Sequence, residues 1–201
     1  MKIVLADLQL PVVTAWQKAF AGVADVEIRH GSIFDVPVDA LVSPANSFGF
    51  MDGGLDLQIS KFFGWHIQSR LQEVIKERHS GELLVATSVI IETDFPEIPY
   101  VIASPTMRVP MILGKETVNV YLAVRAALLR IECLMFPNIE SVSFPGMGTG
   151  VGRVPPDICA RQMRQAFDDV YVGSSFPQTW KEAQERHQLL YSDRYRDLQK
   201  S

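Results

Sequence analysis

The chain alternates between short apolar runs and longer segments in which apolar residues recur every three to four positions. The short runs are rich in β-branched residues, which favours strands, whereas the longer spacing is typical of amphipathic helices. This pattern predicts strands at residues 2–6, 26–30, 39–42, 83–91, 100–103 and 141–144.

Helical spacing predicts four long helices between these strands. Gly64 is expected to break or bend the second helix, and a proline pair opens the last one, because the first helical turn tolerates proline. The predicted ranges are 12–20, 55–78, 116–135 and 155–170. Since strands alternate with helices, the sequence predicts a largely parallel sheet with helices on both faces.

The C-terminal part of the chain has a different character. Residues 173–177 read "GSSFP" and indicate a connector, and residues 178–201 are polar and charged with scattered aromatic residues. A length of 201 residues suits one domain with an appendage. We therefore expect a domain over residues 1–172 and a helical extension, residues 173–201, packed on it.

Composition and charge exclude several classes of protein. The net charge of −4 does not indicate a basic surface for nucleic acid, although a local patch stays possible. Two cysteines and four dispersed histidines suggest neither a disulfide framework nor a metal site. The N-terminal apolar run is too short for a signal peptide, and no window approaches the roughly 18 apolar residues that a membrane span needs. These features predict a cytoplasmic protein with no membrane contact.

Two glycine-rich loops stand out, "SPANSFGFMDGGLD" at residues 43–56 and "PGMGTGVGRVPP" at residues 145–156. Each follows a predicted strand and leads into a predicted helix. Glycines allow the backbone to approach a ligand closely, and the N–H groups at a helix N-terminus favour an anion. Ligands of such sheets bind beyond the carboxyl ends of the strands. Together the two loops predict two walls of a groove around a diphosphate.

Two alternatives compete with this interpretation. The loops can be ordinary tight turns between strands and helices. A dinucleotide-binding fold requires the motif Gly-x-Gly-x-x-Gly after its first strand. The sequence "GMGTGVG" comes late in the chain, and the spacing of its last glycine does not match this motif. A nicotinamide dehydrogenase is therefore disfavoured, but NAD-like ligands stay open.

The motifs resemble those of the macrodomain family, which binds ADP-ribose and often removes it from proteins. The resemblance covers residues 25–170 and rests on "GSI" at 31–33, "DALVSPAN" at 39–46, "GGLD" at 53–56 and "FPGMGTGVGRVP" at 144–155, without gaps. It implies a three-layer αβα fold with a mixed, mostly parallel central sheet. It also implies ADP-ribose and ADP-ribosylated protein as partners, with no cofactor and no metal.

The implied activity is hydrolysis of ester-linked ADP-ribose on proteins. The alternatives are a non-catalytic reader of ADP-ribose, a hydrolase of small ADP-ribose metabolites, and an enzyme acting on ADP-ribosylated nucleic acid. A reader does not need the carboxylate of Asp56, whereas a hydrolase does.

The resemblance also implies roles for single residues. Asp56 is expected to hold or activate the attacking water, and Asn46 to orient the ribose. From the sequence alone, Asp56 is equally a first-turn helix residue, Asn46 a turn residue and Thr149 a turn cap. The expected ligand-binding residues are Ser32, Ile33, Asp52, Gly53, Gly54, Leu55, Gly148, Thr149, Gly150, Val151 and Gly152.

The chain departs from the family pattern at several positions. Ser32 stands where an aspartate usually binds adenine, Ser43 where an asparagine stands, and Gly152 where an aromatic residue lies beside the distal ribose. The loop at residues 43–56 also has no lysine, so the lysine mechanism of one branch is not supported. Phe176 is one candidate for the aromatic residue that covers adenine.

Overall fold

A six-stranded sheet forms the centre of the molecule, in a computed structural model that describes residues 1–133 and 139–198. The strand order is β2-β1-β6-β3-β5-β4, and every neighbouring pair is parallel except β4 with β5. The strands are β1 (Lys2–Asp7), β2 (Val26–His30), β3 (Ala40–Ser43), β4 (Val89–Glu92), β5 (Tyr100–Ala103) and β6 (Ser141–Phe144).

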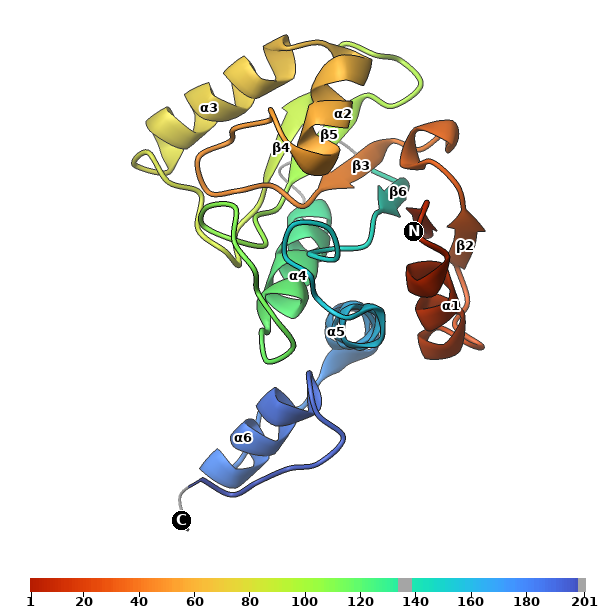
Figure 1. Ribbon diagram of the computed structural model, residues 1–201, viewed down its shortest axis with the longest axis vertical. Coiled ribbons are helices and arrows are strands. Elements are labelled where there is room, and N and C mark those ends of the chain that lie inside the picture. Colours follow the sequence, from red (N-terminus) through yellow and green to blue (C-terminus); the bar gives the residue numbers. More distant parts are fainter. Residues whose placement is uncertain (134–138, 199–201) are drawn as a thin grey trace.

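Helices cover both faces of this sheet (Figure 1). On one face lie α1 (Leu10–Ala19), α4 (Asn119–Ile131) and α5 (Pro156–Asp168), and on the other lie α2 (Gly54–Phe63) and α3 (His66–Arg78). A short 3-10 helix η1 (Ile33–Asp35) follows β2, and a π-helical turn η2 (Asp169–Gly173) continues α5. The last helix, α6 (Trp180–Leu189), lies beyond α5 at one end of the molecule (Figure 1).

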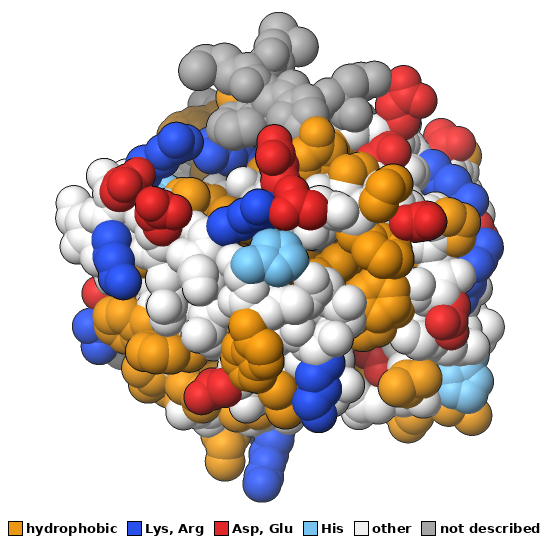
Figure 2. All heavy atoms as spheres, turned by 90° about the horizontal axis from the view of Figure 1, so that it is seen from above, with side chains coloured by type: hydrophobic (Ala, Val, Ile, Leu, Met, Phe, Trp, Pro, Cys, Tyr) orange, Lys and Arg blue, Asp and Glu red, His pale blue; other side chains and the backbone are white. Residues whose placement is uncertain are grey.

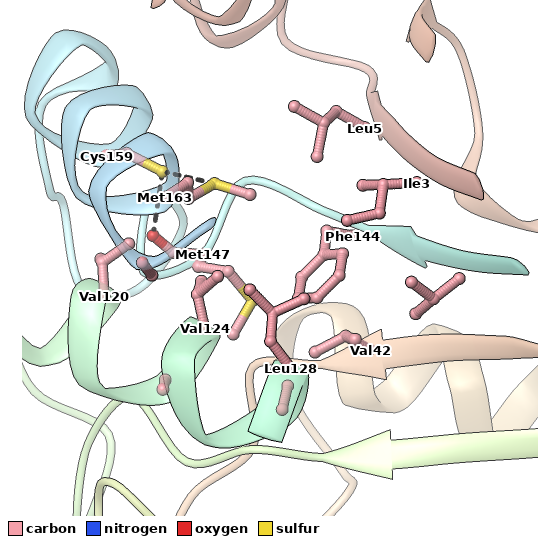
Figure 3. Packing of buried hydrophobic residues seen from close by; sticks show 14 of the residues in the cluster. Ile3, Leu5, Val42, Val120, Val124, Leu128, Phe144, Met147, Cys159 and Met163 are labelled. Atoms are coloured by element: carbon pink, nitrogen blue, oxygen red, sulfur yellow. Dashed lines mark hydrogen bonds between the residues drawn. The ribbon is translucent and has the colours of Figure 1, made fainter. Parts of the chain in front are cut away.

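Alternate residues of the strands point to opposite faces, so the sheet has a core on each side. In β1, Ile3 and Leu5 pack toward α1, α4 and α5, whereas Val4 and Ala6 pack toward α2 and α3. Figure 3 shows the first core, in which Phe144 of β6 meets Leu128 of α4. The predicted three-layer αβα architecture with a mixed, mostly parallel sheet is confirmed.

The predicted break at Gly64 is also confirmed. Gly64 ends α2 with a φ of +106°, a backbone conformation that side chains other than glycine rarely adopt. A Cβ atom at this position would lie 2.9 Å from Nδ1 of His66. The interruption therefore depends on the missing side chain, and it turns one periodic segment into two helices.

The predicted strand at residues 83–91 is wrong in its first half, because β4 begins only at Val89. Leu83 is buried and donates its N–H to the carbonyl of Ser47, while Ala86 has a φ of +78°. The left-handed backbone at Ala86 interrupts an extended chain. Burial of Leu83 in a loop thus produced the same apolar signal as a strand.

Two helices differ in length from the predictions. The helix predicted at 116–135 begins at Asn119, whose N–H binds Thr117 Oγ1 at 3.1 Å, and its predicted end falls outside the described residues. The tail helix occupies only Trp180–Leu189 of the polar segment at 178–201.

No helix among residues 1–133 and 139–198 is long and apolar enough to span a membrane.

The C-terminal segment contacts α5. Arg161 forms an ion pair with Asp193 and donates to the carbonyl of Leu189 at 3.4 Å, and Tyr191 packs against the core. The division of the chain into residues 1–172 and an extension at 173–201 stays a prediction.

Candidate functional site

A cavity of about 810 Å³ lies along the carboxyl edge of the sheet. Segments at the carboxyl ends of five neighbouring strands line it: residues 6–9 at β1, 31–34 after β2, 44–58 after β3, 106–110 after β5 and 145–152 after β6. The cavity brings together every site residue expected from the sequence: Ser32, Ile33, Asn46, Asp52, Gly53, Gly54, Leu55, Asp56, Gly148, Thr149, Gly150, Val151 and Gly152. Their roles in binding and catalysis stay predictions.

The wall after β6 is shaped by backbone turns and by two side-chain hydrogen bonds. Gly148 has a φ of +72°, and its carbonyl accepts the N–H of Val154 at 3.1 Å. The hydroxyl of Thr149 donates to the carbonyl of Gly146 at 2.9 Å, which is the turn-capping alternative for this residue. From the end of β1, Asp7 Oδ2 accepts the N–H of Gly146 at 2.9 Å. These bonds hold the loop in one conformation.

Two sets of backbone N–H groups along the cavity have no protein partner within the described residues. One set comprises Gly148, Gly150, Val151 and Gly152, and the other comprises Gly53, Gly54, Leu55 and Asp56 at the start of α2. The first N–H groups of a helix lack a carbonyl partner inside it, and they carry its positive dipole end. The cavity therefore offers donors for an anion from two walls.

The wall after β3 is held by side chains instead. The amide of Asn46 donates to the carbonyl of Phe50 at 2.7 Å and accepts the N–H groups of Phe48 and Phe50 at 3.1 and 3.3 Å. Gln68 of α3 accepts the N–H of Met51 at 2.7 Å. Asn46 thus organises its own loop, which is the turn alternative for this residue.

Asp56 is the buried carboxyl group of the cavity, with 8% of its surface exposed. The hydroxyl of Ser43, which is fully buried at the end of β3, donates to Asp56 Oδ1. Burial raises the pKa of Asp56 from 3.8 to about 7, against the smaller opposing effect of the Ser43 hydrogen bond. A carboxyl group with this pKa can accept a proton near neutral pH.

The end of the cavity after β2 combines a hydroxyl with an aromatic ring. Ser32 Oγ accepts the N–H of Phe34 at 3.2 Å and caps η1. Phe34 lines the cavity and stacks on Phe62 with ring centroids 4.6 Å apart. Phe176, the aromatic residue suggested from the sequence, is 82% exposed and does not line the cavity.

Sequence reasoning missed two parts of the site. Asp7 lies at the carboxyl end of β1, where a polar residue is a recognisable signal of a ligand site. Residues 106–110 follow the strand predicted at residues 100–103, and their distance along the chain from both glycine loops hid their position.

No group of three or more histidine, cysteine, aspartate or glutamate side chains suited to a metal ion occurs in the described part of the chain. Both cysteines are free thiols. Figure 2 shows one face of the molecule, on which acidic and basic side chains are interspersed.

Comparison with known sequences identifies relatives. The family described as Macro domain matches residues 42–163. An uncharacterized protein of Aquifex aeolicus is 35% identical over 139 residues, which cover 69% of this chain and 78% of that protein. A macro domain-containing protein of Caldanaerobacter subterraneus is 28% identical over 176 residues, covering 87% of this chain and 98% of the relative.

Solved structures share the fold at lower identity. The macrodomain of Mycobacterium tuberculosis DarG superposes with a TM-score of 0.57 at 22% identity, covering 69% of this chain and 87% of its own. A variant of the Oceanobacillus iheyensis macrodomain with ADPR gives 0.59 at 20% identity, with coverages of 68% and 73%. Thermosipho africanus DarTG in complex with ADP-ribose gives 0.55 at 16% identity, with coverages of 74% and 39%.

Proposed function

Because the chain belongs to the Macro domain family, we propose that it binds ADP-ribose in the cavity and hydrolyses ester-linked ADP-ribose on modified proteins. The observation that carries the proposal is the position of a buried carboxyl group, Asp56, in a cavity with two sets of N–H groups that have no partner among the described residues. The names of two structural relatives include ADPR or ADP-ribose, which supports the choice of ligand.

The diphosphate lies between the two sets of N–H groups in this proposal. Among the residues that line the cavity, all of them described, none is lysine or arginine. Recognition of the two negative charges therefore depends on the backbone donors and on the helix dipole of α2. The second ribose, which carries the modified side chain, extends from the diphosphate toward Asp56 and Asn46.

The reaction is displacement at the anomeric carbon of that ribose. The oxygen of a water molecule bonds to this carbon, and the bond from the carbon to the ester oxygen breaks. The protein carboxylate leaves with the bonding electrons, and Asp56 takes the proton of the water. A pKa of about 7 leaves a large share of Asp56 ionised at neutral pH, and general-base assistance contributes about a hundredfold.

A second candidate is a non-catalytic reader of ADP-ribose. Two observations favour it: the amide of Asn46 is already engaged in its own loop, and Ser43 stands where the family pattern has an asparagine. A reader needs the two N–H walls but not the carboxylate.

The test is incubation with an automodified ADP-ribosyltransferase that carries ester-linked marks. We expect the label to leave the protein with time and free ADP-ribose to accumulate. A matched sample with arginine-linked marks controls for linkage, and its label should persist. If the protein binds ADP-ribose in calorimetry but releases no label from esters, the reader function replaces the hydrolase.

A further inference from the structure

Residues 107–113, "MRVPMIL", form backbone hydrogen bonds with both glycine-rich loops at the edge of the cavity. Their first part continues β5 beside the chain that continues β3. Ser104 donates its N–H to the carbonyl of Ser43 at 3.0 Å, and the N–H of Ser47 binds the carbonyl of Arg108 at 3.1 Å. An isolated bridge also pairs Met107 with Asn46. The 107–113 segment therefore starts on the side of the cavity where Ser43 holds Asp56.

The other end of the 107–113 segment docks on the wall after β6. Leu113 donates its N–H to the carbonyl of Gly152 at 2.8 Å. A Cβ atom at Gly152 would lie 2.5 Å from the carbonyl oxygen of Gly148, 3.1 Å from Leu113 Cδ1 and 3.2 Å from Met107 Cε. Position 152 thus has no room for a side chain, and side chains of the 107–113 segment occupy the adjacent space.

The surface that this segment presents to the cavity is uncharged. Met107, Val109 and Pro110 line the cavity. Arg108 is held elsewhere, because its Nε binds Glu82 Oε1 at 2.7 Å and its guanidinium lies 5.1 Å from the centre of the Phe48 ring. An uncharged, largely aliphatic wall suits the face of a neutral sugar ring better than a phosphate.

We propose that the 107–113 segment packs against the second ribose and makes the site prefer ADP-ribose to ADP. This inference rests on the proposed function, which places that ribose beside Asp56. The loop after β6 cannot form a wall beside this ribose, since Gly152 carries no side chain. The segment after β5 forms that wall instead. Val109 contacts the sugar, and Leu113 positions the segment.

The test is calorimetric titration of the full chain with ADP-ribose and with ADP, which lacks the second ribose. Leu113→Ala should displace the segment and so raise the Kd for ADP-ribose about tenfold, the scale of one methylene contact that the segment loses with the sugar, and change the Kd for ADP less than about twofold. Val109 is 43% exposed and does not hold the segment in place. Val109→Ser should therefore also weaken binding of ADP-ribose more than binding of ADP, with a smaller loss of affinity than Leu113→Ala. Ile112→Ala is the matched control, because Ile112 is 60% exposed and does not line the cavity.

Each other result contradicts the inference. Equal losses for ADP and ADP-ribose would show that Leu113 only supports the phosphate loop. If Ile112→Ala raised the Kd for ADP-ribose as much as Leu113→Ala, the loss would reflect general destabilisation of the segment and not a specific contact. A parent that binds ADP as tightly as ADP-ribose would overturn this inference alone, whereas absence of binding to both ligands would overturn the proposed function as well.

Discussion

The two glycine-rich walls of the cavity are built in different ways. The wall at residues 145–156 keeps its shape through backbone turns, which the side chains of Thr149 and Asp7 support, and it presents N–H groups that have no partner within the described residues. The wall at residues 43–56 keeps its shape through the side chains of Asn46 and Gln68, and it ends in the buried carboxyl group of Asp56. One wall therefore offers mainly backbone donors, whereas the other adds a group that can accept a proton.

This difference predicts that the two walls have different roles. Changes in the wall after β6 should affect binding of the diphosphate, and changes at Asp56 should affect turnover. Four experiments test these roles, beginning with the largest expected effect.

The largest effect is expected from Gly150→Glu. A Cβ atom at Gly150 meets nothing within 4 Å, so the domain should fold, whereas Gly148 has a φ of +72° and is a poorer site for substitution. A carboxylate about 4 Å from a phosphate charge costs about 4 kcal/mol at an effective dielectric of 20, roughly a thousandfold in Kd. Calorimetry with ADP-ribose measures the loss.

Gly150→Gln is the matched control for that experiment, because it has nearly the same shape without the charge. It should retain much more of the binding than Gly150→Glu. Retained affinity in a folded Gly150→Glu protein would show that this loop is only a turn.

The second experiment concerns the pH dependence of stability. Since burial raises the pKa of Asp56 from 3.8 to about 7, the folded state keeps this proton after the unfolded state has lost it. The contribution of Asp56 to the free energy of unfolding should therefore fall as pH rises from about 4 to 7, by up to roughly 4 kcal/mol. Urea unfolding of the parent and of Asp56→Asn across this range measures the difference.

In Asp56→Asn this pH-dependent contribution is absent, so the difference between the two curves isolates it from the other carboxyl groups. Parallel curves for parent and variant would show that Asp56 ionises with an ordinary pKa.

The third effect is a loss of turnover in Asp56→Asn. The rate of release of ester-linked ADP-ribose should fall about a hundredfold, because a positioned base acts mainly on the transition state, while the Kd for ADP-ribose changes little. Asp157→Asn is the matched control, since Asp157 is also a first-turn helix residue but is exposed and outside the cavity. Parental turnover in Asp56→Asn would transfer the catalytic role to Asp52 or to the substrate's phosphate.

The smallest effect is expected from Asn46→Ala. Loss of its three hydrogen bonds within the loop should lower the free energy of unfolding by about 1–2 kcal/mol, a decrease of several degrees in Tm. Turnover should fall together with stability. A Tm equal to that of the parent with a large loss of turnover would instead indicate direct contact of Asn46 with the ribose.

The sequence by itself determined the alternation of strands and helices, the break at Gly64 and the two glycine-rich loops. These features are local: the apolar period follows from which face is buried, and a glycine acts through its own backbone angles. The two loops and the site residues that the family resemblance implied line the cavity. The first half of the strand predicted at residues 83–91 was wrong because a buried loop residue such as Leu83 is locally indistinguishable from a strand residue.

Only the tertiary structure decided the features that depend on contacts between distant segments. The raised pKa of Asp56 results from its burial in the packed domain, and the amide of Asn46 is engaged by a loop conformation that its residue type does not specify. Likewise, no pattern in "MRVPMIL" shows that Leu113 lies on Gly152, because the two are brought together by the order of strands in the sheet. Burial and long-range contact are properties of the packed chain. The sequence therefore indicates which residues form the site, whereas the packing sets their pKa values and hydrogen bonds.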